Sequence, residues 1–297
     1  MTWRTGLLAI GLALVGVQTG QAQRTLEGEP PLHVVETGRG ETVIVLHGGP
    51  GLPHTYLREA WDTLSSAYRL VYYDQRGCGR SGEAPSYTWR DHVQDIGRVI
   101  DAVAPGGPVI LAGTSWGAML ALLYTYEHPA QVRALVLSSI PPWPVVARPG
   151  TIGAQGVDVG ELPSHVRARL DSLLQGQPVG DLPRPDQVEP KSPRTDPHLY
   201  GLDSTSAAAF PPTCDRVFRD TNRSLRTVPP LDSLSGLRVP TLVVKGGGTL
   251  IPDGGSQVAQ VLPRASFVVV PRAQHAPWFD HHRDFFAAVF AFVRKPH

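Results

Sequence analysis

The sequence has no excess of charge of either sign. Its 297 residues include 27 Lys and Arg against 26 Asp and Glu, so the formal net charge is +1 at pH 7. A chain that binds nucleic acid or an anionic membrane through a basic surface carries a marked positive excess. The composition therefore argues against nucleic acid and membrane lipid as partners, and 41% hydrophobic residues is typical of a packed globular protein.

Cysteine is scarce as well. Only Cys78 and Cys214 are present, and no group of Cys and His has the spacing of a metal site. The dinucleotide-binding pattern G-x-G-x-x-G does not follow any expected strand, so we expect no metal, nucleotide or redox cofactor. An exported chain can oxidise two cysteines to a disulfide. Distance along the sequence says nothing about distance in the fold, so paired and free thiols both remain open.

A hydrophobic run long enough to span a membrane is also missing. The N-terminal apolar run covers residues 6–17, whereas a spanning helix needs about 20 residues. Arg4 precedes this run and small residues ending at Ala22 follow it, which is the pattern of a secretory signal peptide. We expect residues 1–22 to be removed after Ala22, leaving a secreted or periplasmic protein with no stable membrane association. An uncleaved anchor is the alternative.

Short apolar runs alternate with helical patterns along most of the chain, as in a mostly parallel sheet with helices on both faces. The clearest helix is expected over residues 88–104, because Thr88 and Asp91 form a capping-box pattern ahead of a periodic apolar face. The other expected helices are 118–128, 257–262 and 284–294, and the expected strands are 43–46, 70–73, 109–112, 134–137, 241–244 and 267–270.

This alternation stops after residue 140. Of the 29 prolines, 16 lie between residues 141 and 240, and helical signal there is scattered over 165–174, 207–210 and 214–226. An insertion that follows the carboxyl end of a strand covers the crevice where open α/β sheets bind ligands. We therefore expect one α/β core, residues 23–140 and 237–297, with a cap insertion over residues 141–236.

The segment Gly-Thr-Ser-Trp-Gly at residues 113–117 lies between an expected strand and an expected helix. This is the setting of a nucleophile elbow, in which glycines permit close backbone approach and the turn holds the serine Oγ outward. The N–H groups at the start of the helix, that of Trp116 included, then face developing negative charge. An ordinary Gly-Ser turn is the alternative, but strand, motif and helix together favour Ser115 as a nucleophile.

Two further segments supply partners for such a nucleophile. His-Gly-Gly-Pro-Gly at residues 47–51 follows an earlier strand, and from this position the Gly49 N–H would be the second oxyanion donor. His275 follows the last expected strand, as the general base does in this chain order. His281 and His282 fall at the start of the last helix, where we expect surface residues.

These motifs resemble the proline iminopeptidase-like branch of the α/β-hydrolase fold, peptidase family S33. The resemblance rests on HGGPG at 47–51, DQRGCGRS at 74–81 and GTSWG at 113–117, and it extends from about residue 32 to residue 293. It implies an α/β-hydrolase fold with an inserted cap and substrates that are short peptides or amides with an N-terminal proline. It also implies that DQRG at 74–77 is a structural turn.

The expected triad acid is the one departure from the family pattern. Relatives place an aspartate in G-x-x-D after the strand equivalent to residues 241–245, and here that position is Thr249. Asp253, four residues later, is the carboxylate we expect to serve if the three preceding glycines let the loop reach. The alternative is a Ser-His dyad oriented by Thr249 or by water. Loss of the acid costs about 10⁴ in kcat, so a dyad would be slow but not inert.

The sequence thus predicts an exported serine hydrolase that cleaves small amide or peptide substrates through Ser115, His275 and an acyl-enzyme. A small-molecule carboxylesterase is the alternative within this class, because the same elbow serves both reactions. The alternative from a different class is a binding protein that derives from a hydrolase. The missing triad acid would then indicate that catalysis has been lost. The retention of Ser115, His275 and the Gly49 loop together argues against that alternative.

Overall fold

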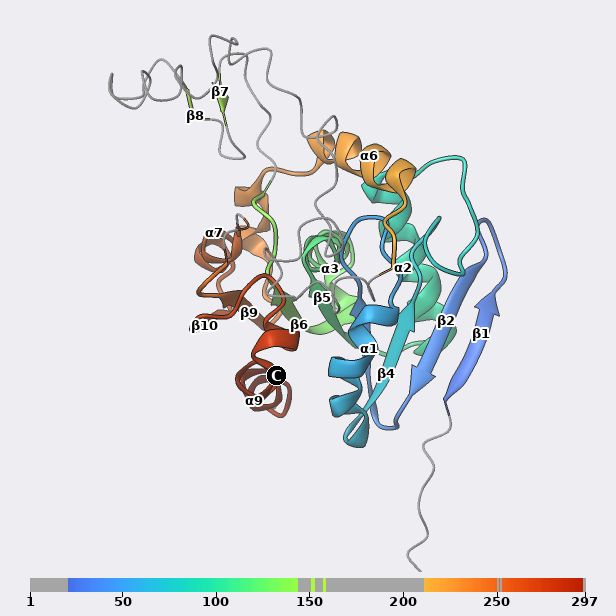
Figure 1. The fold of residues 1–297 in the computed structure, drawn as a ribbon, viewed down its shortest axis with the longest axis horizontal. Helices are drawn as coiled ribbons and strands as arrows, with labels where there is room; N and C mark the ends of the chain where they lie inside the picture. The colour runs from blue at the N-terminus through green and yellow to red at the C-terminus, as the bar shows by residue number, and fades with distance from the viewer. Residues whose placement is uncertain are drawn as a thin grey trace, which may run out of the picture.

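The computed structural model describes residues 21–143, 151–152, 157–158, 211–249, 251 and 253–295, and the structural statements below concern these residues. They form an eight-stranded sheet in the order β1-β2-β4-β3-β5-β6-β9-β10, shown in Figure 1. The β1–β2 and β2–β4 pairs are antiparallel, and every other neighbouring pair is parallel. The strands are β1 (Ala22–Leu26), β2 (Leu32–Thr37), β3 (Glu41–Leu46), β4 (Tyr68–Tyr73), β5 (Val109–Thr114), β6 (Val132–Ser138), β9 (Thr241–Gly246) and β10 (Ala265–Val270).

Helices cover both faces of the sheet. One face packs against α2 (Trp89–Val103), α3 (Trp116–Glu127) and α7 (Gly255–Val261). The opposite face packs against α1 (Thr55–Trp61), α8 (Pro277–Asp280) and α9 (His282–Val293). A central strand such as β5 is buried at every residue, which explains why it reads as a continuous apolar run.

The strands and helices expected from the sequence of the core are confirmed, with bounds that differ by at most two residues. The capping box of α2 is present: Thr88 Oγ1 accepts from the Asp91 N–H, and Asp91 Oδ2 accepts from the Thr88 N–H at 2.8 Å. Four strands and α-helices of the core were not predicted from the sequence: β1, β2, α1 and α8. Most of β1 is exposed on both faces, so its sequence carries no alternation of apolar and polar residues.

The proposed insertion is described only in part. It contains the short β7 (Thr151–Ile152) and β8 (Val157–Asp158) and the helix α6 (Asp215–Ser224). α6 confirms part of the helical signal expected at 214–226, whereas the signals at 165–174 and 207–210 lie outside the described residues. The segment that begins with α6 packs on the start of α2, where Trp89 donates its backbone N–H to Ser224 Oγ at 2.8 Å and its indole N–H to Thr227 Oγ1 at 3.0 Å.

The expected signal peptide lies almost wholly outside the described residues, which begin at residue 21. Ala22, after which we expect cleavage, is the first residue of β1 and pairs with Glu36 of β2. Within the part of the chain that the structure describes, no helix is both long and apolar enough to cross a membrane.

The two cysteines, far apart in the sequence, lie in one small apolar cluster. Cys78 is buried with Ala84, Tyr87 and Val217, and Cys214 packs against this cluster. Both are free thiols, and burial raises the pKa of Cys78. A buried neutral thiol behaves as a small apolar side chain, so the structure gives Cys78 a packing role, with the half-buried Cys214 against the same cluster.

Candidate active site

Ser115 occupies a sharp turn between β5 and α3. Its backbone has φ 54° and ψ −122°, a region that residues with a side chain rarely adopt and that is retained where the surrounding structure enforces it. The Ser115 N–H donates to the carbonyl of Ser138, at the end of β6, at 2.9 Å. Ser115 therefore occupies a strained strand-to-helix turn, as a nucleophile elbow requires, and this half-buried residue lies at the carboxyl end of the parallel strands.

The two glycines of the elbow are required by close backbone contacts. A Cβ at Gly113 would lie 2.2 Å from the carbonyl oxygen of Gly117, and a Cβ at Gly117 would lie 2.3 Å from that of Leu46. Any side chain at either position would collide with main chain. The motif thus reflects the packing of β5, α3 and β3 around the serine.

The glycine-rich loop that follows β3 lies against this serine. A Cβ at Gly48 would come within 3.2 Å of the Ser115 Cβ. The Gly48 N–H donates to the Tyr56 hydroxyl at 2.7 Å, and the Gly48 carbonyl lies 2.9 Å from His47 Nδ1. The loop that carries Gly49 is therefore held beside Ser115, where a serine nucleophile would need an oxyanion donor.

His275 lies in the segment after β10, at the same end of the sheet as Ser115, because β5, β6, β9 and β10 are parallel and adjacent in that order. Its side chain is 5% exposed, and burial lowers its pKa to about 4. The imidazole is consequently neutral at pH 7 and can accept a proton. The neighbouring Gln274 N–H donates to Asp280 Oδ2 at 2.6 Å. This hydrogen bond anchors the His275 segment to α8, a role of Asp280 that no sequence pattern indicated.

The loop after β9 packs on the His275 segment, as the family pattern requires of the acid-bearing loop. A Cβ at Gly246 would lie 2.0 Å from the Gln274 carbonyl, and the Gly248 N–H donates to the Ala273 carbonyl at 2.9 Å. Thr249 comes next, and its Oγ1 accepts from the Ile251 N–H at 3.1 Å. Thr249, which stands where the resembled family has a carboxylate, therefore follows a loop that packs on the segment carrying His275.

Asp253 precedes α7 by two residues, and its Oδ1 accepts from the N–H of Gly255, the first residue of that helix, at 2.7 Å. Burial raises the pKa of Asp253, although the Gly255 N–H and the positive charge of Lys245 act in the opposite direction. The lowered pKa of His275 has burial as its cause, which does not test Asp253 as the partner of this imidazole. Asp253 as the triad acid therefore stays a prediction.

The DQRG segment forms a buried turn at the end of β4. Burial raises the pKa of Asp74, but hydrogen bonds from His54 and from the Arg80 backbone N–H outweigh it and lower the pKa to about 2. Arg76 makes a bidentate ion pair with Asp95 of α2, at 2.7 and 2.9 Å. These contacts agree with the structural role that the resemblance implies for this turn.

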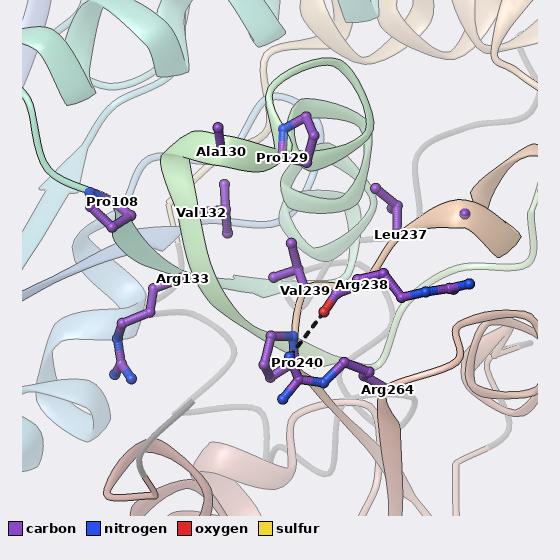
Figure 2. Close-up of a pocket in the computed structure, with 11 residues that line it drawn as sticks. Pro108, Pro129, Ala130, Val132, Arg133, Leu237, Arg238, Val239, Pro240 and Arg264 are labelled. Atoms are coloured by element: carbon purple, nitrogen blue, oxygen red, sulfur yellow. Dashed lines mark hydrogen bonds between the residues drawn. The ribbon is translucent and has the colours of Figure 1, made fainter.

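A groove of about 540 Å³ opens at the other end of the sheet and is drawn in Figure 2. It is lined by residues that precede parallel strands, among them Pro108 before β5, Pro240 before β9 and Arg264 before β10. Figure 2 also shows Arg264 donating to the Arg238 carbonyl, at 3.3 Å. The groove is thus remote from Ser115, and we do not assign it to the catalytic centre.

Comparison with known proteins agrees with this geometry. The chain matches the alpha/beta hydrolase fold family over residues 41–282. It is similar to a proline iminopeptidase from Thermoplasma volcanium, with 23% identity over 273 residues that cover 85% of this chain and 88% of that protein. A proline iminopeptidase from Neisseria gonorrhoeae is 39% identical over 104 residues, which cover 34% of this chain and 33% of that protein.

Solved structures share the fold at low identity. A hydrolase from Pseudomonas aeruginosa PA01 has a TM-score of 0.67 at 17% identity, covering 92% of this chain and 98% of that one. An esterase from Thermogutta terrifontis has a TM-score of 0.63 at 19% identity, covering 93% and 98%. Because the family match spans most of the chain and the sheet has the expected fold, the protein belongs to the alpha/beta hydrolase fold family.

Proposed function

We propose that this hydrolase is an exported serine enzyme that cleaves small amides or peptides with an N-terminal prolyl residue. The strained backbone of Ser115, between a buried strand and a helix N-terminus, carries the proposal, because it is the conformation that presents a serine as a nucleophile. The proline iminopeptidases that the chain resembles support the substrate class. The expected signal peptide supports export.

In the proposed mechanism Ser115 Oγ attacks the substrate carbonyl while His275 takes the serine proton. The N–H groups of Gly49 and Trp116 stabilise the negative oxygen of the tetrahedral intermediate. His275 then returns the proton to the leaving amine, and an acyl-enzyme on Ser115 remains. Water activated by His275 hydrolyses this ester in the second half of the reaction.

The proposal is tested by covalent labelling of the purified protein with a fluorophosphonate, followed by intact-mass analysis. We expect one phosphonyl adduct, located on Ser115 by peptide mapping and missing from Ser115→Ala. Absence of an adduct over several hours would contradict a serine hydrolase and favour the binding protein. The same sample tests export, since a chain that begins at Gln23 supports cleavage and a secreted chain that retains Met1 contradicts it.

Turnover of a prolyl arylamide against a p-nitrophenyl ester then separates peptidase from esterase. We expect kcat/KM to favour the prolyl arylamide over alanyl and leucyl arylamides. Hydrolysis of the ester alone would instead support the carboxylesterase, the second candidate, for which the same elbow and oxyanion loop suffice.

The acid limb of the pH–rate profile should report the protonation of His275. Its pKa is lowered to about 4 from an ordinary value of 6.5, so the base is neutral above about pH 5 and becomes protonated as the pH falls through 4. We expect kcat/KM, which reports the free enzyme, to halve near pH 4, with circular dichroism monitoring the fold. A midpoint at or above 6.5 would show a carboxylate beside His275 that raises its pKa.

A further inference from the structure

The side chain of Gln75 connects the two elements that carry the oxyanion donors. Gln75 follows β4 and is 1% exposed. Its Nε2 donates to the His47 carbonyl at 2.9 Å, and its Oε1 accepts from the Trp116 indole N–H at 2.8 Å. One buried amide therefore joins the start of the oxyanion loop to the first residue of α3.

The backbone of Gln75 also determines how the His47 ring is used. The Gln75 N–H donates to His47 Nε2 at 2.9 Å, so in the neutral ring the proton lies on Nδ1 and is donated to the Gly48 carbonyl. Burial lowers the pKa of His47 to about 4, which keeps the ring neutral at pH 7.

The orientation of Gly49 follows from the Gly48 carbonyl. The Gly48–Gly49 peptide is trans, and in a trans peptide the carbonyl and the following N–H point in opposite directions. Because the Gly48 carbonyl faces the His47 ring, the Gly49 N–H faces away from it. Gln75, through His47, therefore sets the direction of one donor, and through Trp116 it holds the residue that provides the other.

We propose that Gln75 is a positioning residue of the oxyanion hole, which keeps the Gly49 and Trp116 N–H groups at a fixed separation. This inference rests on the proposed function. Donors must lie about 2.7–3.1 Å from the oxyanion, and a displacement of about 1 Å can cost about 10² in rate. Loss of the amide also leaves buried polar partners unsatisfied, so the loop and the helix would shift relative to each other.

The test compares three variants. Gln75→Met has a similar volume and removes both side-chain hydrogen bonds, and Trp116→Phe removes only the indole donor while the backbone N–H stays. Trp89→Phe is the matched control, because Trp89 is equally buried and its indole N–H donates to Thr227 Oγ1, away from the loop. Each is assayed for kcat, KM, melting temperature and affinity for phenylboronic acid, whose tetrahedral adduct places a negative oxygen in the hole.

We expect Gln75→Met to lower kcat by about 10- to 100-fold with KM within twofold, and the boronate affinity to fall in parallel. Trp116→Phe should lower kcat and boronate affinity by a smaller factor. The Gln75→Met/Trp116→Phe double variant should lower them no further than Gln75→Met alone. Trp89→Phe should leave kcat and boronate affinity within twofold.

A folded Gln75→Met protein with unchanged kcat would overturn the inference, and so would a lower kcat without weaker boronate binding. If Gln75→Met fails to fold, Trp116→Phe decides, and an unchanged kcat or a loss no larger than that of Trp89→Phe overturns it. A wild-type protein that neither labels at Ser115 nor turns over substrate would refute the proposed function itself, which distinguishes the two failures.

Discussion

Replacing Ser115 with alanine is expected to lower kcat by about 10²-fold. In a complete serine triad, removal of the serine costs about 2 × 10⁶ and removal of the acid alone about 3 × 10⁴. If Ser115 and His275 act as a dyad, as threonine at position 249 implies, most of the rate that the serine would otherwise contribute is already lost. The expected loss is therefore close to the ratio of those two numbers, and steady-state turnover of the prolyl arylamide measures it.

The size of the loss in kcat on Ser115→Ala also shows whether a triad acid is present. A loss near 10⁶ would show a complete triad, and therefore a carboxylate on His275. Ser138→Ala is the matched control, since it removes a buried hydroxyl that has no hydrogen-bond partner among the described residues, and its kcat should stay within twofold. The Ser115→Ala/His275→Ala double variant should be no slower than Ser115→Ala, because the two residues act as one unit. If the losses in kcat of the two single variants multiply in the double variant, Ser115 and His275 do not act as one unit.

Introducing a carboxylate by Thr249→Asp is expected to raise kcat by about 10²-fold. The physical reason is orientation: a carboxylate on Nδ1 holds the imidazole in the correct tautomer and stabilises its protonated form, an effect worth up to about 10⁴ in a native triad. Thr249 follows a loop packed on the segment that carries His275 and is only half-buried, so a charge there is not fully desolvated. The acid limb of kcat/KM should also move upward from pH 4, because a negative neighbour raises the pKa of His275.

Thr249→Asn is the matched control, with a similar shape and no charge, and we expect less than a threefold change in kcat. A folded Thr249→Asp protein that gains neither rate nor a shifted acid limb would show that this position does not reach His275.

The Asp253→Asn variant tests the competing assignment of Asp253 as the triad acid. The Ser-His dyad predicts an unchanged kcat for this variant, whereas a loss near 10⁴ would establish Asp253 as the acid.

Much of the site could be predicted from the sequence because the chemistry is encoded locally. The elbow at residues 113–117 joins a strand to a helix, and its glycines are needed for contacts among immediate neighbours in the fold. The alternation of apolar runs and amphipathic helices also sufficed to predict a mostly parallel, doubly covered sheet. The strand order could not be predicted in this way, because strands buried on both faces carry no signal for which strand lies beside which.

What the sequence alone determined is therefore the fold class, and it also indicated Ser115 as the candidate nucleophile and the glycine-rich loop beside it. Only the tertiary structure showed that Gln75 links His47 to Trp116, although Gln75 and Trp116 are 41 positions apart in the sequence. It also showed that the loop ending at Thr249 packs on the His275 segment. Such contacts join residues that are distant in sequence, and no local pattern of hydrophobicity or turn residues records them. They depend on how parallel strands bring their carboxyl ends to one edge of the sheet.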